Sequence, residues 1–165
     1  MFDRLRAAAL SLLLIMAFAA PAFAGAFEDA VAKFANDDYS DTAEAIDAVA
    51  ASGNPLAFPI ISALQDERLF ADPESKKVLI KQADDKIIDA ATGAAVEKLP
   101  DGATEVRANN RVRRAVDAAL GNLTLMSPDP ATRIAAAQSV FNVHDEAALP
   151  VVEEALAKET NKSVR

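Results

Sequence analysis

The chain has 165 residues, of which 52% are hydrophobic, and a formal net charge of −8. It contains no cysteine, which excludes disulfides, thiol catalysis and thiolate metal sites. The acidic balance argues against a nucleic-acid partner and against tight adhesion to anionic lipid, because like charges repel. The length is sufficient for one domain with a substantial apolar core.

The amino end has the features of a secretory signal peptide, which we assign to residues 1–24. Arg4 and Arg6 give a positive start, residues 7–20 are nearly all apolar, and Ala22-Phe23-Ala24 is a small-x-small cleavage site. The apolar run of about 14 residues is shorter than the roughly 20 that span a membrane as a helix. The sequence therefore predicts export, with an uncleaved membrane anchor as the alternative.

The first region after this segment, residues 27–65, predicts helices. Phe27, Val31 and Phe34 fall on one stripe of a short helix. The sequence D-T-A-E that starts at Asp41 is a capping-box pattern, so we expect Asp41 to be the N-cap of the next helix.

The end of that helix and the start of its partner carry their own signals. Gly53 is expected just past the end of the helix, and Pro55 suits the first turn of the next one. Pro59 then follows within an apolar stretch. It costs little if it lies in the first turn of the second helix, and it kinks that helix if it lies deeper.

Residues from about 67 to 106 have a different pattern. Residues 78–80, 87–88 and 94–96 are short runs with strand propensity, separated by turn residues. The pattern predicts a small antiparallel hairpin or three short strands, inserted between two helical hairpins. So small a sheet is marginal alone, and we expect it to pack on the helices.

The last region, from Ala108 to the end, again predicts helices. Ser127-Pro128-Asp129-Pro130 is a helix start, with Asp129 as N-cap and Pro130 in the first helical position. The residues expected to face inward on three successive helices are Val112, Val116, Ala119, Leu120 and Leu123, then Ile134, Ala137, Val140 and Phe141, then Leu149, Val152, Ala155 and Leu156.

A short internal repeat in the sequence suggests the architecture. The sequence A-F-P-I-I at 57–61 is repeated as A-L-P-V-V at 148–152, and Val49 is echoed by Val140. Helix pairs of this length joined by short turns are typical of HEAT solenoids. We therefore expect residues 25–165 to form a mainly α domain of HEAT-like stacked hairpins with a small β-hairpin insertion.

We expect a third copy to begin at residues 161–165, where the sequence ends. A stacked hairpin buries its face only against a neighbour, so an unfinished stack leaves one face uncovered. On this ground the sequence predicts the leading domain of a longer protein, truncated before any transmembrane region. Whether it is a fragment or a complete product stays open.

Residues with catalytic chemistry are few. His144, the one histidine, is expected in a turn beside Asp145, where we interpret it as a solvated turn residue. Asp37, Asp38 and Asp41 form an acidic cluster, but without the spacing of a calcium loop, and charge complementarity with a helix start accounts for it. No catalytic, cofactor-binding or metal-binding residue is predicted, and no cofactor is expected.

The most distinctive polar feature of the sequence is a group of arginines. Arg107, Arg111 and Arg114 are expected to share one helical face, with Arg113 beside it, in an otherwise acidic chain. They are the candidate residues for contact with a partner or an anion. The alternative is an ordinary face in which Glu97, Glu105 or Asp117 forms salt bridges with them.

These same residues carry a family resemblance. V-R-A-N-N-R-V-R-R at 106–114 and A-A-L-G-N-L-T-L-M-S-P-D-P at 118–130 resemble the extracytoplasmic amino-terminal segment of the urea ABC transporter permease, B subunit, of the branched-chain amino acid type. The stretches at 27–34, 40–42, 57–59 and 157–160 are similar too, so that the resemblance extends over residues 27–165.

The resemblance implies part of a bacterial inner-membrane importer for urea. Its protein partners would be the other urea transporter subunits, namely a second permease and two ATPases, and a periplasmic substrate-binding protein. The domain would lie on the periplasmic side, and membrane contact is expected only through a missing carboxyl-terminal part. No segment after residue 24 approaches 18 consecutive apolar residues, so no translocation residue is assigned.

Two functional hypotheses follow, and a third ranks below them. The first is a domain of a urea importer permease that docks the substrate-binding protein or braces the transporter, without catalysis. The alternative is a stand-alone periplasmic helical-repeat scaffold or adaptor protein. An enzyme would need a pair of carboxylates with separated pKa values in a cleft, and no residues in the sequence mark one.

Overall fold

The computed structural model describes residues 22–143 and 149–165. In this part the chain forms six α-helices, one short 3-10 helix and five short strands. The elements in chain order are α2 (Ala22–Ala32), η1 (Lys33–Asn36), α3 (Tyr39–Ala51), α4 (Ala57–Gln65), β1 (Leu69–Asp72), β2 (Lys77–Lys81), β3 (Ile87–Asp89), β4 (Ala95–Val96), β5 (Thr104–Glu105), α5 (Asn110–Leu125), α6 (Pro130–Val143) and α7 (Leu149–Lys158).

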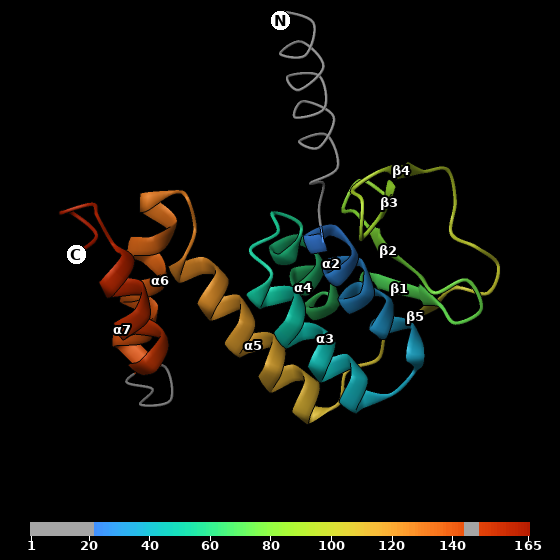
Figure 1. Cartoon of the computed structure of the whole chain (residues 1–165), viewed down its shortest axis with the longest axis horizontal. Coiled ribbons are helices and arrows are strands. Elements are labelled where there is room, and N and C mark those ends of the chain that lie inside the picture. Colours follow the sequence, from blue (N-terminus) through green and yellow to red (C-terminus); the bar gives the residue numbers. More distant parts are fainter. Residues whose placement is uncertain (1–21, 144–148) are drawn as a thin grey trace, which may run out of the picture.

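The helices α2, α3 and α4 and the sheet form one body, and α5 leads from it to the hairpin of α6 and α7 at the other end of the molecule (Figure 1). Phe27, Val31 and Phe34 are all buried, which confirms the expected stripe along α2 and η1. They meet Ile46 and Val49 of α3, which are also fully buried. The core therefore begins with the short leading helix.

The start of α3 corrects one prediction, because Asp38 and not Asp41 is the N-cap. The Asp38 carboxylate accepts hydrogen bonds from the amides of Ser40 (2.7 Å) and Asp41 (3.1 Å). Asp37 before it has a left-handed backbone (φ 52°), which ends η1 and turns the chain into α3. Asp41 lies in the first turn instead and accepts a hydrogen bond from Asn36.

The turn from α3 to α4 follows the sequence signals. Gly53 has φ 68°, a conformation that glycine adopts without strain, directly after the C-cap Ser52. Pro59 is the third residue of α4, within the first turn, where the missing amide breaks no helical hydrogen bond. The favourable alternative for Pro59 is thus confirmed.

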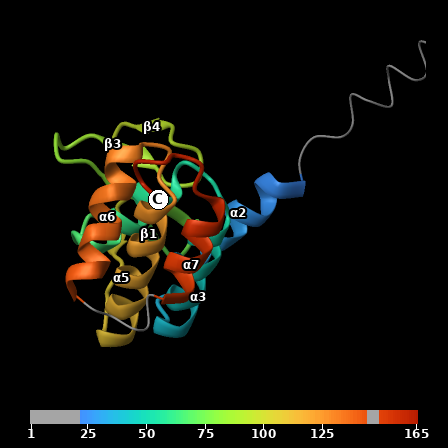
Figure 2. The ribbon, with the colours of Figure 1, turned by 90° about the vertical axis from the view of Figure 1, so that its left-hand side faces the viewer.

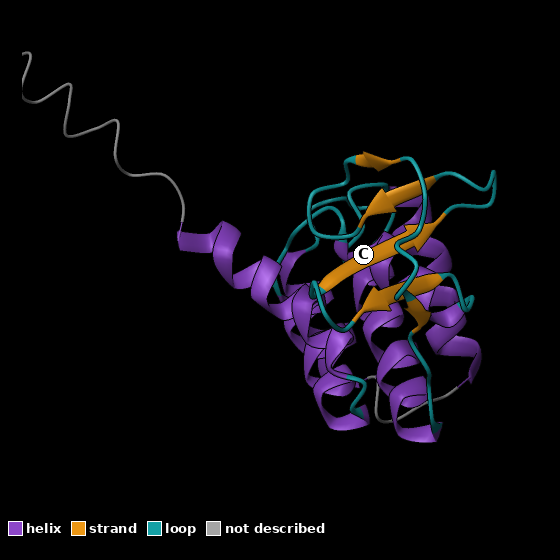
Figure 3. Ribbon diagram, turned by 90° about the vertical axis from the view of Figure 1, so that its right-hand side faces the viewer, coloured by secondary structure: helices purple, strands orange, loops and turns teal. Residues whose placement is uncertain are grey.

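The five strands form one antiparallel sheet in the order β4-β3-β2-β1-β5. The strands expected near 78–80, 87–88 and 94–96 are confirmed as β2, β3 and β4, while β1 and β5 were not predicted. The sheet lies against the helices (Figure 3), where α2, η1 and α4 contact its central strands. Leu69, Val78 and Ile80 bury their side chains at this contact.

The helix α5 lies across α3 and α4 and confirms the stripe predicted for it. Val112, Val116 and Ala119 are buried, and Leu120 and Leu123 pack against the same core. Asn109 is the N-cap, and its side chain accepts hydrogen bonds from the amides of Arg111 and Val112. α5 contacts α3 and α4 as well as α6 and α7, and Figure 2 views the molecule from the end where α6 and α7 lie.

The hairpin of α6 and α7 is only partly as expected. Asp129 caps α6 through the amides of Ala131 and Thr132, and Pro130 opens the helix, as predicted. The prediction that Phe141 faces inward is wrong, because this side chain is 75% exposed. Leu149 and Leu156 are also exposed, since the hairpin packs mainly against α5 and finds no second neighbour among the described residues.

The fold is therefore mixed α/β with helix predominant and one small antiparallel sheet, which agrees with the mainly α prediction in coarse terms. The β-containing insertion covers Leu69 to Glu105, close to the expected 67–106. His144 and Asp145 lie outside the described residues.

The contact of α5 with α3 and α4 gives a test of the packing. We expect Val116→Ala to lower the free energy of unfolding by about 2 kcal/mol, because it removes buried methyl groups and leaves a cavity. Urea unfolding followed by circular dichroism measures it. Ala118→Ser on the exposed side of the same helix is the control and should change it by less than about 0.5 kcal/mol. Equal effects of the two substitutions would contradict the packing.

Candidate protein-interaction surface

Four arginines stood out in the sequence as a candidate contact region, and the structure places them in two groups. Arg107 precedes α5, which begins at Asn110, so the prediction that Arg107 shares a helical face with Arg111 and Arg114 is wrong. The N-cap Asn109 explains the difference, because its backbone is extended and the chain before it runs back to β5. Arg111, Arg113 and Arg114 are on the helix and exposed.

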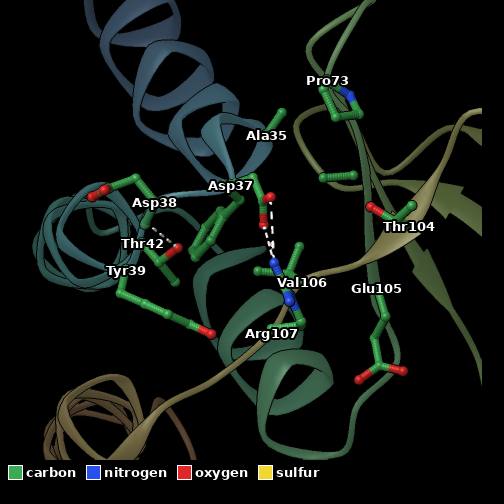
Figure 4. Close-up of a pocket in the computed structure, with 12 residues that line it drawn as sticks. Ala35, Asp37, Asp38, Tyr39, Thr42, Pro73, Thr104, Glu105, Val106 and Arg107 are labelled. Carbon is green, nitrogen blue, oxygen red and sulfur yellow. Dashed lines mark hydrogen bonds and ion pairs between the residues drawn. The ribbon is translucent and has the colours of Figure 1, made fainter.

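Arg107 has an ion-pair partner that the sequence analysis did not name. Its Nη2 lies 3.0 Å from Oδ1 and 3.4 Å from Oδ2 of Asp37, on the turn between η1 and α3 (Figure 4). Hydrogen bonding to this carboxylate raises the pKa of the Arg107 guanidinium. Both side chains are about two-thirds exposed, so the pair adds little stability. The ion pair does connect the segment between β5 and α5 to the start of α3.

Arg111, Arg113 and Arg114 have no ion-pair partner among residues 22–143 and 149–165. The salt bridges with Glu97, Glu105 or Asp117 that we considered as the alternative do not form there. Asp117 instead accepts a hydrogen bond from Gln65 at 3.3 Å. The three guanidinium groups are therefore free to meet a partner.

An open hollow of about 500 Å³ lies beside Arg113, between the start of α3, the end of α4 and the segment that precedes α5. Its apolar lining comes from Tyr39, Leu64, Val106 and Val116. Its polar rim carries Arg107 and Arg113, and also the carboxylates of Glu67, Glu105 and Asp117. A hollow with mixed charges and a small apolar floor suits a side chain of a partner better than a small-molecule anion.

A larger open groove of about 930 Å³ separates the α3–α4 turn from the hairpin at the other end of α5. Phe58, which is 45% exposed, lines one wall, and α5 contributes Asn122, Leu123 and Thr124. Glu154 and Lys158 of α7 also line the groove and form an ion pair with each other at 2.6 Å. The groove therefore has a mixed lining of apolar and polar residues.

Arg133 and Glu159 form a bidentate contact in the hairpin, which was not predicted from the sequence. Arg133 Nε and Nη2 lie 2.6 and 3.0 Å from the two carboxylate oxygens of Glu159. The Glu159 side chain is only 7% exposed and also accepts a hydrogen bond from the amide of Asn161. Arg133 Nη1 donates to the carbonyl oxygens of Ser127 and Pro128. This network fastens the segment after α7 to the α5–α6 turn.

The acidic cluster is accounted for by local contacts. Asp38 caps α3, Asp37 binds Arg107, and Asp41 accepts from Asn36. In the described part of the chain, no three residues among His, Asp and Glu are placed to hold a metal ion. Nor does any helix in that part have the length and apolar composition to cross a membrane.

Comparison with known proteins adds no relative. The sequence matches no protein-family model, no curated protein and no solved structure.

The Arg133–Glu159 contact predicts a pH dependence. Hydrogen bonding to Arg133 lowers the pKa of Glu159 below its ordinary value of 4.5. The stabilisation is therefore complete above the ordinary pKa and is lost as the pH falls through the lowered one. We expect Glu159→Gln to lower the Tm above about pH 5, and the gap from the wild type to shrink towards about pH 3.

Thermal melts at successive pH values measure this gap. Glu154→Gln is the matched control, because Glu154 is 55% exposed in its pair with Lys158. We expect a much smaller gap for that variant. A gap for Glu159→Gln that stays constant with pH would contradict the role of the charged contact.

Proposed function

We propose that the chain is the amino-terminal periplasmic domain of a urea ABC importer permease, and that it docks or braces the transporter rather than carrying out catalysis. The sequence blocks at 106–114 and 118–130 support the proposal most. They resemble that permease family, and in the fold they form α5 and its junction with α6. The resemblance thus falls on the element that presents the three unpaired arginines.

The residues of these blocks include the caps of two helices and an exposed group of arginines. Asn109 caps α5, and Asp129 caps α6. Arg111 and Arg114 have no comparable structural contact among the described residues. In this proposal the caps set the position of α5, and the arginines provide the contact with another subunit or with the periplasmic substrate-binding protein.

The repeat character belongs to the same proposal. The prolines of the echoed segments occupy similar places, with Pro59 third in α4 and Pro150 second in α7. Val49 is buried in α3, and Val140 is half-buried in α6. We propose that α3–α4 and α6–α7 are HEAT-type hairpins, with α5 and the β insertion between them. Export through residues 1–24 would place the domain in the periplasm.

The alternative, a stand-alone periplasmic scaffold, is favoured by a different observation. The groove beside Phe58 is open and lined by both apolar and polar residues, a mixture that is common in surfaces that bind proteins. An adaptor would use this groove without any transporter subunit. Binding of the purified chain to the urea-binding protein separates the two proposals.

The test uses purified residues 25–165 on a biosensor and the periplasmic urea-binding protein of the same organism. We expect reversible binding with a Kd on the order of 1–100 μM, as is typical of small transient interfaces. A second readout is the uptake of labelled urea by cells whose importer lacks this domain, which we expect to fall. The absence of binding together with undiminished uptake would exclude the importer proposal and favour the adaptor.

A further inference from the structure

We propose that the exposed amino-terminal face of α5 binds an acidic surface of a partner protein. This arginine face consists of Arg111 and Arg114, flanked by Arg113. The inference rests on the proposed docking function and specifies the chemistry of the partner: carboxylate side chains that accept bidentate hydrogen bonds from guanidinium groups.

The first argument is the lack of partners in an acidic molecule. The chain has 25 acidic and 17 basic side chains, so carboxylates are in excess. Lys33, Arg68, Arg107 and Arg133 each have an ion-pair partner within 3.0 Å. Arg111, Arg114 and the flanking Arg113 have none within the described ranges.

The second argument is that Arg111 and Arg114 occupy positions that the helix itself disfavours for cations. They lie in the first two turns of α5, where the positive end of the helix dipole disfavours cations. The first turn contains no acidic residue, whereas α3 has Asp41 in its first turn and α6 is capped by Asp129. Arg111 and Arg114 also repel each other at a spacing of three residues. Because these arginines disfavour the start of the helix, we infer that their charges serve contact with a partner.

The third argument is geometric. The opposite side of α5 is fixed in the core through Val112 and Val116, so the arginine face is presented on a rigid helix. Further along, the face continues with Ala118 and Gly121, and a side chain added at Gly121 would have no neighbour within 4 Å. A partner can therefore approach the helix closely while its carboxylates reach Arg111 and Arg114.

The surrounding charges identify the class of partner. Asp37, Asp38 and Asp41 lie at the start of α3, and Asp117 lies on α5 itself. A planar anionic bilayer or a nucleic-acid duplex would face these carboxylates as well and be repelled. Glu67, Glu105 and Asp117 lie around the hollow beside Arg113. A small group of carboxylates on a protein surface can meet Arg111 and Arg114 without covering that hollow.

The test compares two charge-reversal variants of residues 25–165. The first variant combines Arg111→Glu and Arg114→Glu and removes the arginine face. The control variant combines Lys77→Glu and Lys162→Glu, which makes the same change in net charge at exposed lysines elsewhere. The probe is a fluorescein-labelled octaglutamate peptide, followed by anisotropy at about 20 and about 200 mM NaCl. We expect the wild type to bind at low salt, the first variant to bind at least about tenfold more weakly, and the control to stay within about twofold.

A thermal melt checks the fold of each variant. The first variant should melt at or above the wild-type temperature, because glutamates suit the start of a helix. No octaglutamate binding by the wild type, or equal losses in both variants, would overturn the inference. Tighter binding to phosphatidylglycerol vesicles than to the peptide would overturn it in favour of a membrane. Peptide binding through the arginines without binding of the urea-binding protein would reject the importer proposal and leave the acidic-partner inference standing.

Discussion

The apolar stripe of α5 against α3 and α4 is the contact on which the other parts of the structure depend. Val112 and Val116 are almost completely buried there, in the same core as Ile46 and Ile60. The sheet and the short leading helix extend that core on one side, while α6 and α7 are attached mainly through α5. Burial of apolar area is the main stabilising term in such a fold. Loss of this contact would separate the hairpin from the larger body.

The same contact divides α5 into a buried side and an exposed side. One side is committed to the core, so its position is fixed to the accuracy of side-chain packing. The other side exposes Arg111 and Arg114, which take no part in that packing. A rigid helix that presents unpaired cations is a suitable docking element, because little conformational entropy is lost on binding. The ion pair of Arg107 with Asp37 supports this arrangement by fastening the chain just before the helix.

The hairpin of α6 and α7 is less tightly integrated. No residue of α7 is fully buried, and the polar network of Arg133 and Glu159 supplies a large part of its attachment. Regions with few buried apolar contacts open at lower free-energy cost than the core. We therefore expect this hairpin to open at a lower free-energy cost than the larger body.

The sequence predicted those features that depend on neighbouring residues. Gly53, Asp129 and the stripe of Val112 follow from local capping and from helical periodicity, which few residues determine. The N-cap of α3 was misplaced because several aspartates stand close together, and the left-handed backbone of Asp37, invisible in the sequence, selects Asp38.

Features that depend on distant residues were missed. β5 has only two residues, too few for an alternating pattern, and it pairs with β1 more than 30 residues earlier. Arg133 and Glu159 are 26 residues apart, and no periodicity relates them. The exposure of Phe141 likewise depends on which neighbour covers the hairpin. For the candidate site, the arginines themselves were recognised. Arg107 was wrongly placed on the helix because Asn109 was not recognised as the N-cap of α5.

The claim that α5 is the docking element is tested most directly by mapping chemical-shift changes. Labelled residues 25–165 would be titrated with the urea-binding protein of the same organism, and amide shifts followed by NMR. The account predicts that the largest changes lie in the first half of α5, around Arg111 and Arg114, and diminish with added salt. Changes confined to the sheet or to the groove beside Phe58, with α5 unaffected, would contradict it.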